Sequence, residues 1–196
     1  MQKILILLAH PFLERSRIHN ELVKQASRIS GVTINDLYEW YPEFDINVRR
    51  EQQLLLDHDI IIWQHPFYWY SAPALLKQWQ DIVLEHDWAY GRNGTALKGK
   101  KIFNVLTTGA GEEAYKPSGF NKYTIQDFLR PYERTAELCH MTYWPSYWVS
   151  GVHKMTKEEA SAFAQNYAAM LEMLVQGGNE ETIMQQQSLL NTIVNW

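Results

Sequence analysis

The amino-acid sequence predicts an α/β protein built on a doubly wound, five-stranded parallel sheet with helices on both faces. Short aliphatic runs alternate along the chain with longer segments in which apolar residues recur at helical spacing. Neighbouring strands of a parallel sheet need crossover connections, which the longer segments provide. The 196 residues suit one well-cored domain better than two, and we expect a domain over residues 1–176 and a C-terminal tail over 177–196.

The first half of the chain has the order strand, helix, strand, helix, strand. Residues 4–8 form an uninterrupted aliphatic run, as expected of a strand covered on both faces. A helix should begin at Ser16, a good N-cap, and continue to about Arg28, and Gly31 should stop it. The other elements of this half are a strand over 32–37, a helix over 48–56 and a buried strand over 60–63.

The second half continues the alternation. Pro73 suits a first helical turn, and an apolar stripe follows it at helical spacing. This stripe consists of Leu75, Leu76, Trp79, Ile82 and Val83. We further expect a strand over 101–107, a helix over 124–139, a fifth strand near 141–149 and a helix over 156–175. Pro131 lies inside the first of these two helices and should kink, split or delay it.

Three loops that follow predicted strands contain the residues best suited to bind a ligand. His10-Pro11 follow the first strand, residues 65–71 follow the third, and residues 107–111 follow the fourth. Doubly wound sheets bind ligands beyond the carboxyl ends of their strands. The three loops should therefore share one rim.

The loop after the third strand carries four consecutive aromatic residues. These are Phe67, Tyr68, Trp69 and Tyr70. Flat apolar faces beside exposed backbone N–H groups suit a planar heteroaromatic ligand, although such a run is as often packing or a subunit interface. His65 is as readily a buried spacer before Pro66 as a ligand contact.

The other two loops offer hydrogen-bond donors. The TTGAG segment at 107–111 has two hydroxyls and two glycines, which let a ligand edge approach the backbone, although the same residues can merely finish and turn a strand. The first loop ends at a helix N-terminus with Ser16, Arg15 and Arg17, a combination that suits a phosphate. The chain has no Walker motif and no GxGxxG, which favours a mononucleotide over a dinucleotide.

Composition makes several functional classes improbable. The net charge is −4, from 22 acidic and 18 basic residues without a basic run, so nucleic acid is not an expected partner. The first apolar run is too short for a signal peptide or a membrane span, and we expect a cytoplasmic protein. Cys139 is the single cysteine, expected as a small buried hydrophobe. No histidine pair has metal-binding spacing, and no GxSxG elbow suggests a hydrolase.

Four segments together resemble the NAD(P)H quinone reductase family of flavodoxin-like FMN proteins. The segments are AHP after the first strand, QHPFYWYSAPALLKQW after the third, WAYGRNGTALKGK at 88–100 and TTGAGEEAY after the fourth. The resemblance covers about residues 3–147 and is greatest to the ancillary flavoproteins of glutathione-gated potassium efflux systems. It implies a strand order of 2-1-3-4-5 and a homodimer with one FMN near each subunit boundary. Hydride would pass from NAD(P)H through FMN to a quinone or related electrophile.

The resemblance also implies the residues of the site. The FMN contacts of the family correspond to His10, Ser16, Arg17, Ile18, His19, Phe67, Tyr68, Trp69, Tyr70, Thr107, Thr108, Gly109 and Ala110. Tyr115 matches the tyrosine that helps to stabilise the reduced flavin, with surface packing as the competing interpretation. Trp88 and Tyr90 match a loop that faces the neighbouring subunit's site, where they would help to form an acceptor pocket.

Two residues depart from the family pattern. Asn121 stands where the mammalian-type reductases have a histidine, and an amide cannot supply or store a proton near neutral pH. Robust quinone turnover is therefore less expected. The alternative is an ancillary regulatory subunit of a potassium efflux antiporter, held at the inner face of the membrane by that partner without inserting into the membrane itself. Ala110 replaces the second glycine of TTGG and should still adopt the required turn.

Two further segments have less certain roles. Residues 40–47 form a polar and aromatic connection that could lie across a dimer boundary. In the tail, Ile183, Gln187, Leu190 and Val194 fall near one helical face, so the tail could pack on a subunit or extend into solvent.

Overall fold

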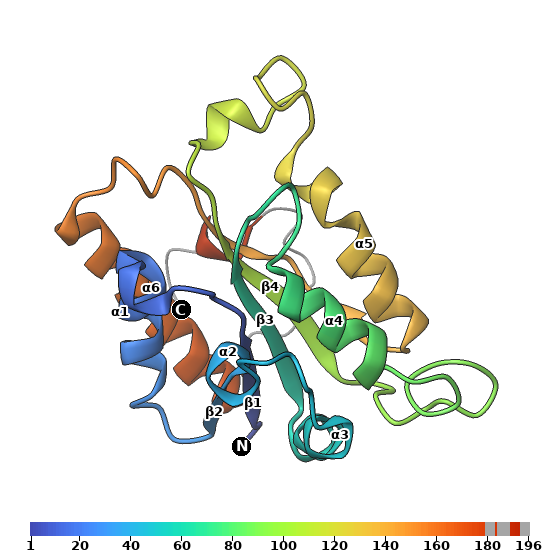
Figure 1. The fold of residues 1–196 in the computed structure, drawn as a ribbon. Coiled ribbons are helices and arrows are strands. Elements are labelled where there is room, and N and C mark those ends of the chain that lie inside the picture. Colours follow the sequence, from blue (N-terminus) through green and yellow to red (C-terminus); the bar gives the residue numbers. More distant parts are fainter. Residues whose placement is uncertain (179–182, 184–188, 193–196) are drawn as a thin grey trace.

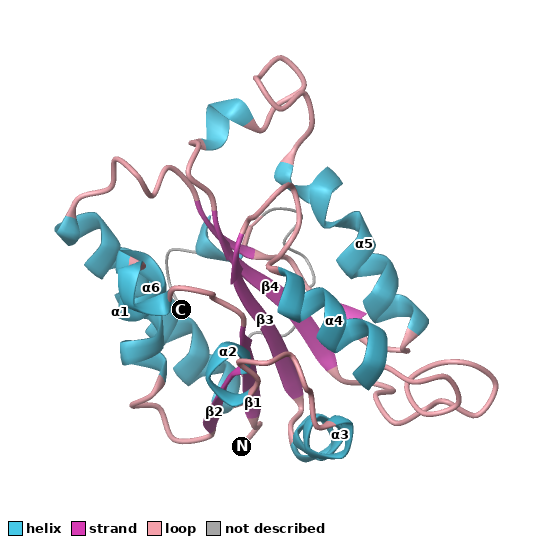
Figure 2. Ribbon diagram, viewed as in Figure 1, coloured by secondary structure: helices cyan, strands magenta, loops and turns pink. Residues whose placement is uncertain are grey.

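A parallel sheet forms the centre of the structure, with helices on both of its faces (Figure 1, Figure 2). The computed structural model describes residues 1–178, 183 and 189–192. The strands are β1 (Ile4–Leu8), β2 (Val32–Asp36), β3 (Ile60–Pro66), β4 (Lys101–Thr107), β5 (Thr142–Tyr143) and β6 (Tyr147–Val149). They follow the order β2-β1-β3-β4-β5, with β6 also paired to β4. The doubly wound fold and its strand order are confirmed.

Alternate residues of β1 belong to two separate hydrophobic clusters. Leu5 and Leu7 pack under α3 (Val48–Asp57), α4 (Ala74–Val83) and α5 (Ile125–Leu138). Ile4, Ile6 and Leu8 pack against α1 (Arg17–Ala26) and α6 (Lys157–Val175) on the other face. Because both faces are covered, the strand is aliphatic at every position rather than at every second one.

The fifth strand is broken into two short pieces. Both β5 and β6 pair with β4, and Trp144, Pro145 and Ser146 separate them. Proline has no N–H to donate to a ladder, which accounts for the interruption of the strand predicted near 141–149.

Two local predictions need correction. The second strand ends at Asp36, because its carboxylate accepts hydrogen bonds from the N–H groups of Tyr38 and Glu39 and so begins the short helix α2 (Leu37–Trp40). The segment over 40–47 thus begins with a helical residue. Helix α5 runs without a break through Pro131, so the proline neither splits nor delays it, and of the three expected effects only a kink stays a prediction.

The described part of the tail packs on its own chain. Ile183 and Leu190 are fully buried in the cluster that contains α6. The Leu190 N–H donates to the Ser146 carbonyl at 3.0 Å, and the Asn191 Oδ1 accepts from the Trp148 N–H at 3.0 Å. These residues therefore cover β6, while Gln187 and Val194 lie outside the described residues.

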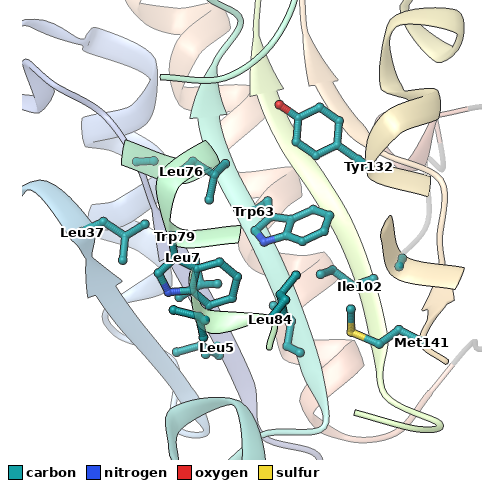
Figure 3. Close-up of a cluster of buried hydrophobic side chains, with 14 of the residues drawn as sticks. Leu5, Leu7, Leu37, Trp63, Leu76, Trp79, Leu84, Ile102, Tyr132 and Met141 are labelled. Carbon is teal, nitrogen blue, oxygen red and sulfur yellow. The ribbon is translucent and has the colours of Figure 1, made fainter. Parts of the chain in front are cut away.

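A buried carboxylate joins four elements on the α3–α4 face. Glu51 is fully buried, and its two oxygens accept hydrogen bonds from the Tyr41 hydroxyl at 2.6 Å, the Asn35 amide at 2.8 Å, the Trp79 indole at 2.8 Å and the Arg50 guanidinium. Trp79 belongs to the hydrophobic cluster shown in Figure 3. The four donors compensate for the removal of the charge from water.

We predict that Glu51→Gln lowers the free energy of unfolding by about 3 kcal/mol, because the amide N–H₂ would face two hydrogen-bond donors in either orientation of the side chain. Denaturant titration measures this change. Asp57→Asn, at an exposed carboxylate of the same helix, should change stability by less than about 0.5 kcal/mol. Equal effects of the two substitutions would contradict this account of Glu51.

Candidate functional site

A cleft of about 540 Å³ lies beyond the carboxyl ends of β1, β3 and β4. Its lining residues come from the three loops that follow these strands and from the loop after β6. They are His10, Phe12, Arg15, Ser16, Arg17, Ile18, Pro66, Phe67, Tyr68, Thr107, Gly109, Val152 and His153. The predicted common rim of the three loops is therefore observed.

The N-terminus of α1 forms part of the lining of the cleft. The Ser16 side chain accepts a hydrogen bond from the His19 N–H at 3.1 Å and so caps the helix. The N–H groups of Arg17 and Ile18 open the helix and have no acceptor within it. With Arg15 and Arg17 also on the lining, this part of the cleft suits an anionic group.

Aromatic side chains form another part of the lining. Phe67 and Tyr68 line the cleft, and the chain then reverses in a tight turn in which Tyr68 and Ser71 exchange backbone hydrogen bonds of 3.1 and 2.9 Å. Both central residues of this turn are in the left-handed region, with φ of 49° at Trp69 and 61° at Tyr70. Bulky residues rarely adopt this conformation, which costs on the order of 1 kcal/mol each and is concentrated at functional sites.

The predicted cofactor contacts divide into two groups. Eight of them line the cleft: His10, Ser16, Arg17, Ile18, Phe67, Tyr68, Thr107 and Gly109. The others, His19, Trp69, Tyr70, Thr108 and Ala110, lie outside this lining. Trp69 is 94% exposed, Tyr70 stacks on Phe128 with 5.1 Å between ring centroids, and His19 is buried behind Thr107.

The loop after β4 is held by the strand next to it. The Thr108 hydroxyl donates to the Ala110 carbonyl at 2.8 Å and accepts from the Trp148 indole at 3.0 Å. The Ala110 carbonyl also accepts from the Gly151 N–H at 3.0 Å. Ala110 is not among the residues with positive φ, which explains why this position tolerates a side chain.

Tyr115 is buried rather than packed on the surface. Its ring contacts Trp148 and Phe67 edge to face, at centroid distances of 5.3 and 6.0 Å. Burial raises the pKa of Tyr115, and hydrogen bonding to the side chains of Thr108 and Asn121 opposes this rise. Tyr115 and Asn121 are thus brought together, behind Phe67 and outside the lining of the cleft.

Of three histidines at this site, His10 lines the cleft, whereas His19 and His65 are fully buried beside Thr107 and Pro66 of the lining. Burial lowers the pKa of His10, partly offset by the charge of Glu14, and lowers the pKa of His19 far below its usual value. His65 bonds the Pro66 carbonyl through Nδ1 at 3.0 Å and the Asn104 amide through Nε2 at 2.9 Å. Burial lowers its pKa to about 4. His65 is therefore a neutral, structural histidine.

Sequence reasoning missed several residues of the lining. His153 is the clearest case, because a Cβ on Gly109 would lie 2.5 Å from its Nε2. Its position shortly after the last strand is the signal that could have identified it, because doubly wound sheets bind ligands beyond the carboxyl ends of their strands. Phe12 and Val152 were also missed.

Other predicted residues lie away from the cleft. Trp88 and Tyr90 belong to the connection between α4 and β4, near the amino end of β4 (Figure 1). Cys139 is buried at the end of α5 as predicted, and burial raises the pKa of its thiol to about 11. Within the described ranges no group of three or more His, Cys, Asp or Glu side chains could hold a metal ion. Among the same residues, no helix combines the length and apolarity needed to cross a bilayer.

The chain is similar to proteins of one family. A sequence model described as having a flavodoxin-like fold matches residues 2–174. The glutathione-regulated potassium-efflux system ancillary protein KefG of Pectobacterium carotovorum subsp. carotovorum (strain PC1) is 44% identical over 169 residues, or 86% of this chain and 92% of that protein.

Two solved structures show the same similarity. General stress protein 14 of Treponema denticola, in complex with FMN, has a TM-score of 0.84 and 38% sequence identity, and the match covers 88% of this chain and 99% of that one. An NADPH-quinone reductase from P. pentosaceus has a TM-score of 0.78 and 36% identity, with 86% and 96% of the two chains covered.

We predict that His65 makes stability depend on pH. Its folded-state pKa of about 4 lies below the ordinary value of 6.5, so the unfolded chain binds the proton first as the pH falls. The free energy of unfolding should therefore drop between pH 6.5 and pH 4, with about 3 kcal/mol from this residue. Denaturant titrations across this range should show a flatter pH dependence for His65→Gln. An unchanged slope in His65→Gln would contradict the assignment.

Proposed function

Because this chain belongs to the family with the flavodoxin-like fold, we propose that it is an FMN-dependent NAD(P)H oxidoreductase of the quinone reductase type. In this proposal hydride passes from NAD(P)H through FMN to a quinone or a related electrophile. The single observation that carries it is the lining of the cleft, which combines the N-terminus of α1 and its arginines with the aromatic side chains of Phe67 and Tyr68. The FMN complex of the 38% identical Treponema denticola protein supports the choice of ligand.

The residues present fit FMN. The N-terminus of α1, with Ser16 and Arg17, would hold the phosphate, and Phe67 and Tyr68 would pack against the ring system. Gly109 lines the cleft without a side chain, so the ligand could approach its backbone. When bound, FMN supplies the ring that accepts a hydride and passes it on, while the protein holds and orients that ring.

We assign Tyr115 and Asn121 the catalytic positions of the site. The Tyr115 hydroxyl would donate a hydrogen bond to the carbonyl edge of the ring as charge develops there. Its raised pKa keeps it protonated near neutral pH, as this role requires. Asn121 would orient the hydroxyl of Tyr115 without exchanging a proton with it.

A second function is favoured by Asn121 and by the 44% identity to KefG. In this alternative the chain is an ancillary regulatory subunit that adjusts a potassium efflux antiporter by direct contact and has weak or no turnover. Either function would employ a homodimer, in which Trp88 and Tyr90 lie near the site of the neighbouring subunit. Trp88 and Tyr90 are not among the lining residues of the cleft of their own chain, which is consistent with this arrangement.

We predict that the purified protein binds FMN and oxidises NADH or NADPH in the presence of a soluble quinone. Flavin absorbance and the loss of nicotinamide absorbance measure the two steps. Binding with negligible turnover for every acceptor would favour the regulatory function. A protein that binds no flavin at saturating FMN would exclude both.

A matched pair of glycines tests the position of the ligand. In Gly109→Ala the new methyl group would lie 2.5 Å from the His153 Nε2, on the lining of the cleft, so FMN affinity should fall about tenfold, or about 1.4 kcal/mol. Gly111→Ala meets no atom within 4 Å and should bind FMN as the wild type does. Titration of flavin fluorescence gives both constants, and equal affinities of the two variants would argue against a ligand at Gly109.

A further inference from the structure

Four side chains form a continuous hydrogen-bonded chain from the cleft into the interior. The Thr107 Oγ1 lies 3.1 Å from the His19 Nε2, and the His19 Nδ1 lies 3.3 Å from the Gln64 Nε2. The Gln64 Oε1 in turn lies 3.0 Å from the Tyr167 hydroxyl. Thr107 lines the cleft, whereas His19, Gln64 and Tyr167 are fully buried. The chain therefore connects β4, α1, β3 and α6 across the interior.

The direction of each hydrogen bond follows from Tyr167, the residue at the buried end of the chain of side chains. The Tyr167 hydroxyl donates to the Gln64 carbonyl oxygen, which places the Gln64 N–H₂ group toward His19. The His19 Nδ1 must then accept, so the proton of the neutral imidazole is on Nε2. The Nε2–H donates to the Thr107 oxygen. The Thr107 hydroxyl therefore does not donate to His19, and its hydrogen can be donated to a ligand in the cleft.

The opposite direction would leave a buried group unpaired. If the Gln64 amide were turned over, its N–H₂ group would face the Tyr167 oxygen, and the Tyr167 hydrogen would lose the acceptor that the described residues give it. A buried donor without a partner is strongly disfavoured. The lowered pKa of His19, caused first by burial and then by His10 and His65, keeps the imidazole neutral and so preserves one accepting nitrogen.

We propose that Tyr167, acting through Gln64 and His19, fixes the Thr107 hydroxyl as a hydrogen-bond donor into the cleft. Thr107 adjoins both the aromatic loop and the first turn of α1, because its carbonyl accepts from the Phe67 N–H at 2.8 Å and its hydroxyl contacts His19. The ligand atom selected there is an acceptor oxygen of the polyol that joins ring and phosphate. This inference rests on the proposed binding of FMN, with Tyr167 as a positioning residue that does not touch the ligand.

The tautomer of His19 tests the chain without any flavin. Long-range ¹H–¹⁵N spectra of the ligand-free wild-type protein should show His19 with its proton on Nε2. In Tyr167→Phe, which removes only the hydroxyl, the two tautomers should mix. A proton on Nδ1 in the wild type overturns the inference, and this measurement decides the matter even if Tyr167→Phe fails to fold.

A double-mutant cycle tests the connection to the ligand, with FMN dissociation constants measured by fluorescence titration. Thr107→Val should weaken FMN binding about tenfold and Tyr167→Phe about threefold, while the double variant should bind no more weakly than Thr107→Val alone. Tyr147→Phe is the matched control, because the Tyr147 ring packs on Tyr167 at 5.3 Å but its hydroxyl donates to the Phe163 carbonyl. It should bind FMN as the wild type does.

Additive effects in the cycle, or equal losses in Tyr147→Phe and Tyr167→Phe, overturn the role of Tyr167 while the proposed function stands. If the wild-type protein binds no FMN, the proposed function is wrong, and the flavin polyol cannot be the group to which Thr107 donates. In that case the spectra still decide whether Tyr167 sets the tautomer of His19.

Discussion

Parallel pairing of β1, β3 and β4 is the constraint on which the site depends. In this register Leu8 lies opposite Gln64, and Pro66 opposite Thr107, so the loops that leave the three strands emerge at one edge. Residues more than fifty positions apart thus come within hydrogen-bonding distance of each other. The helices on both faces protect the ladder from water, which allows the loops at its end to vary in chemistry without loss of the scaffold.

The interior of this scaffold is more polar than its aliphatic strands suggest. Glu51 has four hydrogen-bond donors, and His65 lies between a carbonyl and an amide. Each of these groups would be unfavourable alone, and each is matched by partners from other elements. Such fully paired networks favour one arrangement of the helices over alternatives with similar apolar packing. The rigid support they give differs from the strained turn at Trp69 and Tyr70, where a rare backbone conformation is kept at the surface.

Most of the fold could be predicted from the sequence, because aliphatic runs, helical stripes and caps are local signals. The shape of the cleft rim followed from topology, and eight of the suggested contacts line it. Local patterns could not show how deeply a side chain is buried relative to the cleft. Nothing in the neighbours of Tyr115 or His19 distinguishes a residue on the lining from one directly behind it, since that difference depends on Trp148 and on Thr107, which lie far away in the sequence. Glu51 was missed for the same reason, as its donors come from distant elements. At Pro131 a local signal was present but was overridden, because tertiary packing on the sheet retained a helix that the local rule would interrupt.

The contacts of Leu190 and Asn191 with β6 bear on how copies of this chain can associate. The Trp148 N–H and the Ser146 carbonyl are the groups that an incoming strand would use, and both already have partners. An outer strand closed in this way is protected against edge-to-edge aggregation. A paired assembly that uses this side of the sheet would accordingly join through helices and loops, and would not extend the sheet beyond β6.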